Sequence, residues 1–450
     1  MPTTRPDDTD IRARTVREML RIAIPLAFAE LGWMSMYVVD NIMVGHLRDS
    51  AVAIGAVSVG GALFSAFAIF GIGLMSGLDT LISHAYGARN LAEAHRLLAA
   101  AITLALCLSP IIAGSILGLP PLLGLLGVEP AIRAPAVSFI RIIVWSMPLL
   151  LVYTTFRRYL QGIHYVRPVT FALITSNLVN VFGNWILIYG HWGAPALGIR
   201  GSAFSTVFAR LYLAGVLVLA VRLRDPAALH NLRPDWPRMS ALFRLGLPAA
   251  LTTGFEVGVF NTTTALVASI DPVSLAAHTI ALNAASVTFM VPLGIASAAA
   301  VSVGRALGAG QRRRAVAAGW TAIGIAVVFE VGSALAFFFL PRPIARAYTH
   351  DPAVISFAVK LLWIAGVFQI FDGIQTVATG ALRGMGNTRT PMIWNLVCYW
   401  VIGLPLGCWL CFDLRWGATG LWYGLCLALM LIGTGLLATW HLSTKLLQDY

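Results

Sequence analysis

The sequence predicts an all-α polytopic membrane protein with twelve transmembrane helices in two parallel-repeat six-helix bundles. Hydrophobic residues make up 58% of the 450 residues and charged residues only 11%, with a mean hydropathy of +0.81. Such values lie far outside the composition of soluble proteins. Apolar blocks long enough to cross about 30 Å of hydrocarbon recur from end to end. Finally, short stretches of the first half recur in the second half at nearly constant spacing.

The apolar blocks run continuously and lack the alternation of barrel strands, so they predict helices. The first block follows the polar stretch MPTTRPDDTDIRARTVREML and has no small-residue cleavage site, so we expect the first span to be retained. The twelve spans are expected to start near residues 18, 52, 96, 136, 168, 197, 243, 276, 316, 355, 391 and 418.

The net charge of +12 is explained by membrane topology rather than by nucleic-acid binding. With the N-terminus placed in the cytoplasm, 22 of the 31 Lys and Arg residues fall inside and only 6 outside. This asymmetry favours cytoplasmic N- and C-termini and an even number of spans. The predicted organisation is a cytoplasmic tail (1–17), an N-lobe (18–222), a charged linker (223–240), a C-lobe (241–443) and a C-terminal tail (444–450).

Four stretches of the first half have counterparts in the second half, in the same order. RIAIPLAF at 21–28 matches RLGLPAAL at 244–251, and AYGARNLAEA at 85–94 matches ALGAGQRRRA at 306–315. YLQGIHYVRP at 159–168 matches ALRGMGNTRTP at 381–391, and GIRG at 198–201 matches GATG at 417–420. An offset of six spans restores orientation, so the halves are predicted to be parallel repeats, as secondary transporters commonly have.

Motifs typical of other functions are missing from the sequence. It contains no GxxxxGK[ST] for an ATP motor, no HExxH or GxSxG, and no TVGYG-like filter. We therefore expect neither an enzyme nor a cofactor. The five cysteines all lie in apolar runs and are expected to be packing residues rather than a redox or disulfide set.

Asp40 is the most informative residue of the first half, because ionisable side chains within a span are rare and usually functional. Helical spacing places Trp33, Met36 and Tyr37 near its face, and aromatic and thioether groups suit a flat organic cation. The fifth span offers a polar face that includes Asn180 and Asn184. A structural pairing of Asp40 with a neighbouring helix, and interhelical bonding by the amides, remain the alternatives.

Two further acids occupy spans of the second half. Glu256 lies in LPAALTTGFEVGVFNTTTAL, and Asp372 has polar neighbours at helical spacing. These neighbours are Gln369, Gln375, Thr376 and Thr379. Carboxylate, hydroxyl and amide oxygens form either a Na⁺ site or a proton site, so we predict cation coupling at Glu256 and Asp372, with a possible Na⁺ between them.

Three other acids have no predicted functional role. Glu30 belongs either deep in the first span or at its cytoplasmic vestibule, Asp79 is expected to form a structural ion pair beside basic loops, and Glu330 stands alone in the ninth span.

At these residues the sequence resembles the multidrug and toxic compound extrusion (MATE) family, and within it the NorM-like branch. The stretches that carry the resemblance are VVDNIMVGHL, DTLISHAYGAR, QGIHYVRP, LTTGFEVGVFN and FDGIQTVATGALRGMGNTRTPM. They are spread over both halves. The resemblance implies a V-shaped pair of six-helix bundles around a central cavity. It also implies coupling residues at Asp40, Glu256 and Asp372 and a polar cavity position at Asn180, while Asn184 departs from the aspartate that several relatives carry.

The expected function is therefore secondary active efflux of organic, often cationic, compounds in exchange for H⁺ or Na⁺, by alternating access. The alternatives are a flippase or exporter of a lipid-linked or polysaccharide precursor, and a membrane receptor or scaffold. A flippase would be expected to carry cations in its cavity, whereas the interior here is acidic apart from Arg210. We expect a monomer in the bacterial inner membrane.

Overall fold

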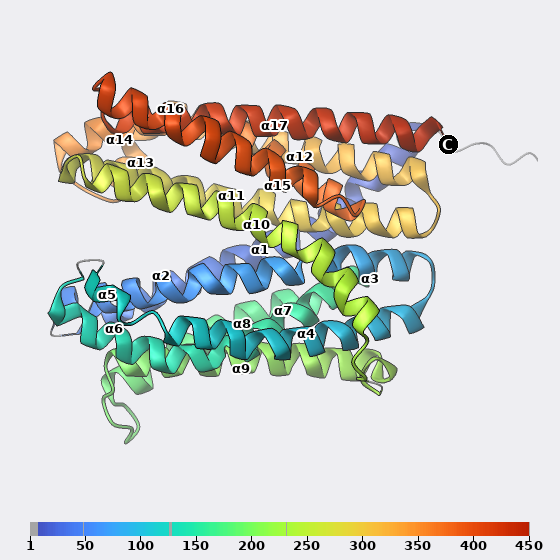
Figure 1. Ribbon diagram of the computed structural model, residues 1–450, viewed down its shortest axis with the longest axis horizontal. Helices are drawn as coiled ribbons and strands as arrows, with labels where there is room; N and C mark the ends of the chain where they lie inside the picture. Colours follow the sequence, from blue (N-terminus) through green and yellow to red (C-terminus); the bar gives the residue numbers. More distant parts are fainter. Residues whose placement is uncertain (1–7, 48, 126–127, 231, 450) are drawn as a thin grey trace, which may run out of the picture. The chain divides into compact units, whose positions relative to one another are not determined.

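A computed structural model describes residues 8–47, 49–125, 128–230 and 232–449. Within these ranges every regular element is helical (Figure 1), as predicted. Residues 1–7 of the predicted cytoplasmic tail and Arg48 lie outside the described residues.

The first half of the chain contains helices α1 to α9 and two short 3₁₀ turns. Their bounds are α1 Asp8–Val44, α2 Ser50–Met75, α3 Gly77–Gly87, α4 Leu91–Leu117, α5 Leu122–Leu125, α6 Pro130–Ile143, η1 Val144–Ser146, α7 Met147–Gly162, α8 Arg167–Tyr189, α9 Ile199–Arg224 and η2 Pro226–Leu229.

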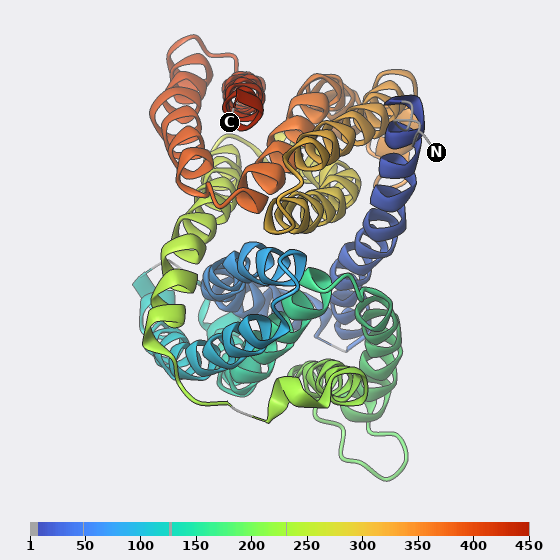
Figure 2. The ribbon, with the colours of Figure 1, turned by 90° about the vertical axis from the view of Figure 1, so that its right-hand side faces the viewer.

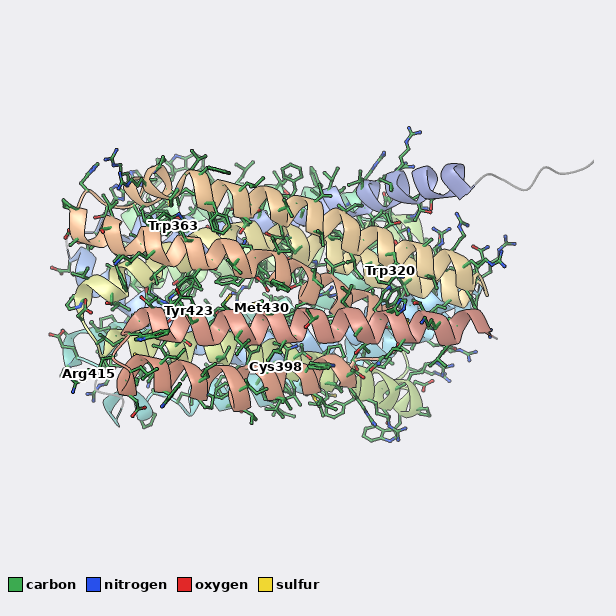
Figure 3. All side chains as sticks on the ribbon, turned by 90° about the horizontal axis from the view of Figure 1, so that it is seen from above. Trp320, Trp363, Cys398, Arg415, Tyr423 and Met430 are labelled. Atoms are coloured by element: carbon green, nitrogen blue, oxygen red, sulfur yellow. The ribbon has the colours of Figure 1, made fainter. Side chains whose placement is uncertain are left out.

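The second half contains helices α10 to α17, interrupted by two π-helical segments, η3 and η4. Their bounds are α10 Trp236–Ala268, α11 Pro272–Gly308, α12 Arg312–Phe339, α13 Pro341–Arg346, α14 Pro352–Gly384, α15 Arg389–Asn395, η3 Leu396–Gly403, α16 Leu404–Cys408, η4 Trp409–Asp413 and α17 Ala418–Asp449. Figure 3 shows Arg415, between η4 and α17, toward the opposite end of this helix set from Trp320, near the start of α12.

Eleven segments of the described chain are long and apolar enough to cross a membrane. They match eleven of the twelve predicted spans. The remaining predicted span corresponds to α10, which is 33 residues long but contains Glu256, Asn261 and several threonines and glycines. Its polar content, not its length, separates it from the others.

The chain divides into two compact units, one of residues 28–250 and one of residues 1–27 together with 251–450. In the end-on view of Figure 2, each unit is a bundle of helices. The boundaries fall inside α1 and α10, two residues after Pro25 and Pro248, whereas the sequence places the lobe boundary in the linker 223–240.

Close helix contacts at glycine explain where these boundaries fall. A Cβ atom on Gly294 of α11 would lie 2.5 Å from the backbone nitrogen of Ala27, so the first part of α1 packs tightly on α11. Likewise, a Cβ atom on Gly73 of α2 would lie 2.6 Å from the Cα of Ala250 in α10. Because only glycine allows backbones this close, the first part of each of these helices belongs to the unit built by the other half of the sequence.

Large buried side chains fill the interior of each unit. Phe64 and Tyr159 are buried in the unit of residues 28–250, and Phe368, Trp422 and Trp440 in the other. All five cysteines are free thiols, as the sequence predicts.

Candidate functional site

Asp40 lies on α1, is 92% buried, and is held by neutral side chains of two other helices. Its carboxylate accepts hydrogen bonds from Asn184 Nδ2 of α8 at 2.6 Å and from Thr206 Oγ1 of α9 at 3.1 Å. Asn184 also donates to Asn180 Oδ1 at 3.3 Å. The predicted grouping of Asp40 with Asn180 and Asn184 is therefore present, with the asparagine at 184 acting as a donor to the acid.

Arg210 is the nearest basic residue along α9, one turn beyond Thr206. It is buried, bonds to Ser146 Oγ at 2.5 Å and lies over the ring of Phe64 at 4.5 Å. Within the described residues it forms no ion pair with Asp40. A buried carboxylate whose hydrogen-bond donors are all neutral is suited to take up a proton or a cation.

The three cavity candidates on α1 have different surroundings. Trp33 stacks on Tyr153 of α7, with ring centroids 5.9 Å apart, and Met36 is buried in the core of the unit. Tyr37 is 53% exposed. Contact of these three residues with a substrate stays a prediction. Tyr37 is the most exposed of the three.

Two buried ion pairs attach α7 to its neighbours in the same unit. Arg157 pairs with Glu30 of α1, and Arg158 pairs with Asp79 of α3 at 2.9 Å. All four residues are buried. The ion pair predicted for Asp79 is therefore found. Both arginines lie in the last part of α7, which ends at Gly162.

Glu256 of α10 is half-buried and connected to two other helices by a chain of hydrogen bonds. Gln375 of α14 donates from Nε2 to Glu256 Oε1 at 3.3 Å, and Tyr399 of η3 donates from its hydroxyl to Gln375 Oε1 at 3.3 Å. Next to Tyr399, Trp400 donates from Nε1 to the backbone oxygen of Phe255 at 3.0 Å. These hydrogen bonds hold the Glu256 side chain and the backbone of Phe255 in place.

Tyr399 and Trp400 were not predicted as site residues. They lie in the π-helical segment η3, and such wide turns occur frequently at functional sites. Two adjacent aromatics within an apolar span carry no periodic signal that separates them from packing residues, although the absence of Lys, Arg and His from this stretch is consistent with an acid site.

Asp372 lies on α14 and is 92% buried. Its Oδ1 atom has no hydrogen-bond partner among the described residues, and neither has the hydroxyl of Thr376 one turn further along. Gln369, three residues before Asp372, donates from Nε2 to Glu330 of α12 at 3.2 Å and to Thr288 of α11. The predicted polar face of α14 is therefore real, but its amides reach two different acids.

No group of three or more His, Cys, Asp or Glu side chains in the described part of the chain is placed to hold a metal ion. The possible Na⁺ at Glu256 and Asp372 stays a prediction. A separate surface pocket of 430 Å³ opens between α13 and the start of α14, near Trp363 (Figure 3). It is lined by Arg342, Arg346, His350 and Lys360, so its charge is opposite to that expected for a cation site.

Long apolar helices, repeated halves and acids buried in both units define a polytopic membrane transporter. The chain belongs to the MatE family, whose model matches residues 25–186 and again residues 248–409. The second match starts 223 residues after the first, which is the offset that relates Pro25 to Pro248. The repeat predicted from the four pairs of matching stretches is therefore confirmed as a repeat of the family unit.

Curated relatives cover nearly the whole chain. A probable multidrug resistance protein NorM of Mesorhizobium japonicum is 34% identical, with 94% of this chain and 93% of the relative covered. The multidrug resistance protein NorM of Burkholderia vietnamiensis is 36% identical, with 96% and 95% covered. The solved structure of an outward-facing multidrug resistance MATE family transporter of the MOP superfamily shares the fold, with a TM-score of 0.89, 17% identity and 100% of both chains covered.

Proposed function

We propose that this protein is a secondary active multidrug exporter that releases organic, often cationic, compounds in exchange for H⁺ or Na⁺. The observation that carries the proposal is Asp372, a buried membrane acid with a carboxylate oxygen that has no protein donor and with no basic partner among the described residues. Relatives that are named for multidrug resistance over almost the whole chain support the substrate class.

The exchange rests on competition for the same negative charge. A carboxylate in a low-dielectric site is stabilised either by a proton or small cation or by a positively charged substrate. Uptake of the coupling ion at Glu256 and Asp372 from the outside would remove the charge that holds an organic cation and so favour its release. Alternating access of the two units, with Tyr37 and the amides near Asp40 in contact with substrate, completes the proposal.

The energy source depends on how much net charge crosses the membrane in each exchange. One-for-one exchange of monovalent cations draws on the ion gradient alone, because no net charge crosses. Each additional proton or Na⁺ that enters per exported monocation gains about 2.3 kcal/mol per 100 mV. No ATP site is needed for this. The proposed setting is the bacterial inner membrane, with cytoplasmic termini and a monomeric chain.

The test compares Asp372→Asn with Gly254→Ala, a control on α10 where a Cβ atom meets nothing within 4 Å. Cells that express the parent or the control should extrude a fluorescent organic cation, and cells that express Asp372→Asn should not, at equal protein levels. Proteoliposomes with separately imposed pH and Na⁺ gradients then identify the ion. Unchanged extrusion by Asp372→Asn would refute the coupling role, and no cation movement under either gradient would refute the exchange.

The structure supports the lipid-precursor alternative less well. A diphosphate-linked cargo requires cations in the transport site, whereas the acids of α10, α12 and α14 have no basic partner in the described part of their unit.

A further inference from the structure

Glu330 is a buried acid that the proposed exchange does not yet use. It lies in the middle of α12, only 1% of its surface is exposed, and it forms no ion pair within the described residues. Such a carboxylate is unfavourable in the interior of a membrane protein unless a proton, a cation or hydrogen-bond donors compensate its charge. Among the described residues Glu330 accepts a hydrogen bond from Gln369 but has no basic partner.

Glu330 lies against the helix that carries Asp372. A Cβ atom on Gly373, the residue after Asp372, would lie only 2.6 Å from Glu330 Cγ. The side chain of Glu330 therefore packs directly against the α14 backbone at Gly373. Glycine at 373 thus leaves room for the side chain of Glu330 against the part of α14 that carries Asp372.

Gln369 links Glu330 to its surroundings. Its Nε2 donates to Glu330 Oε2 and to Thr288 Oγ1, while its Oε1 is fully buried and has no donor among the described residues. Asp372 Oδ1, three residues along the same helix, likewise has none. Two buried acceptor atoms of this stretch, Gln369 Oε1 and Asp372 Oδ1, thus lack a donor in the described part of the chain. A protonated Glu330 provides an additional O–H donor to the side chain that it already contacts.

Other ionisable groups do not compensate the charge of Glu330. Helices α11, α13, α14 and α17 all pack on α12. His278 of α11 has both ring nitrogens engaged, by Thr264 at 2.8 Å and Trp422 at 3.0 Å. The other ionisable groups described on these helices are Arg305, Arg342, Arg346, Lys360, Asp372, Arg383, Tyr423, Cys426, His441 and Lys445. No ion pair joins any of the basic ones to Glu330.

We infer that Glu330 is a third proton-binding acid of this unit, which takes up and releases a proton together with the Glu256 and Asp372 pair. The step is a simple proton transfer: the carboxylate gains H⁺ from the outside medium and loses it to the cytoplasm, and no other bond changes. The proposed ligand of Glu330 is a proton, because a buried carboxyl group that carries one is neutral and needs no charged partner. The inference rests on the proposed exchange function and sets its stoichiometry.

The experiment counts protons. Purified full-length protein in weakly buffered detergent solution is mixed with a fluorescent organic cation, and a pH dye reports protons released per cation bound. Proteoliposomes then give the ratio of protons to cations from the pH gradient at which net cation flux stops. Glu330→Gln preserves side-chain shape and removes the titrating group. We expect it to lower both counts by one proton per cation, and Gly332→Ala, where a Cβ atom on the same helix meets nothing within 4 Å, to leave them unchanged.

Each outcome separates the two claims. If the parent protein neither releases protons nor moves the cation against a pH gradient, the proposed proton exchange fails. If the parent does both and Glu330→Gln has the same counts, the exchange holds and the role of Glu330 is overturned. Should Glu330→Gln fail to fold, Glu330→Asp replaces it: a shifted pH dependence of proton release supports the inference, and the parental pH dependence overturns it.

Discussion

The buried pair of Glu30 and Arg157 gives a quantitative prediction for stability. Replacing Glu30 by Met leaves Arg157, which is 7% exposed, without its carboxylate partner. An uncompensated buried charge of this kind costs about 3–5 kcal/mol. For a unit of this size, about 1 kcal/mol corresponds to about 2–4 °C in the unfolding midpoint. We therefore expect Glu30→Met to lower the midpoint by roughly 6–20 °C.

The control pair is already present in the chain. Glu18 and Arg314 lie 3.7 Å apart with side chains that are 67% and 56% exposed, so Glu18→Met should cost less than about 1 kcal/mol. The double variant Glu30→Met/Arg157→Met removes both buried charges and should recover most of the loss. The assay is thermal unfolding of purified protein in detergent, followed by tryptophan fluorescence. A midpoint for Glu30→Met within about 2 °C of the parent, or a double variant as unstable as the single one, would show the reasoning to be wrong.

Three further predictions concern packing, capping and the acid site. Gly246→Ala places a Cβ atom 2.0 Å from the backbone oxygen of Leu74. This substitution should lower the free energy of unfolding by about 1–3 kcal/mol or more, whereas Gly254→Ala should raise it by about 0.5–1 kcal/mol. Equal thermal unfolding midpoints for the two variants would contradict the packing argument. Asp271 caps α11, and hydrogen bonds from Ser274 lower the pKa of this acid. The stabilisation of α11 by ionised Asp271 is therefore present above an ordinary aspartate pKa and is lost as the pH falls through the lowered pKa. Asp271→Ala should lower the free energy of unfolding by about 1 kcal/mol at pH 7. A loss of stability that does not shrink toward pH 3 would argue against the cap. Tyr399→Phe leaves a buried amide oxygen without its donor and should cost about 1 kcal/mol and slow cation efflux, so parental efflux and stability together would exclude its role.

Continuous apolar blocks were sufficient to predict eleven spans that the described chain contains, and isolated acids singled out Asp40, Glu256 and Asp372. The partners of these acids were only partly predictable. Helical spacing placed Gln375 near Asp372, but its bond to Glu256 depends on how α10 and α14 pack, which no local pattern specifies.

The burial of Arg157 and Arg158 was not predictable for a physical reason. Two adjacent arginines near a predicted loop usually mark a membrane surface, and only the positions of Glu30 and Asp79 on other helices make their burial tolerable. Tyr399 was missed because its hydroxyl is the only feature that distinguishes it from its apolar neighbours. The boundaries inside α1 and α10 depend on backbone contacts at single glycines, which long-range packing alone reveals.

The reciprocal contacts of Gly73 with Ala250 and of Gly294 with Ala27 have a consequence for expression of the separate halves. The beginning of the first long helix of each half belongs to the compact unit that the other half builds, as when protomers exchange a segment in a swapped dimer. Either half expressed without its counterpart would therefore lack the helix segment that completes its fold.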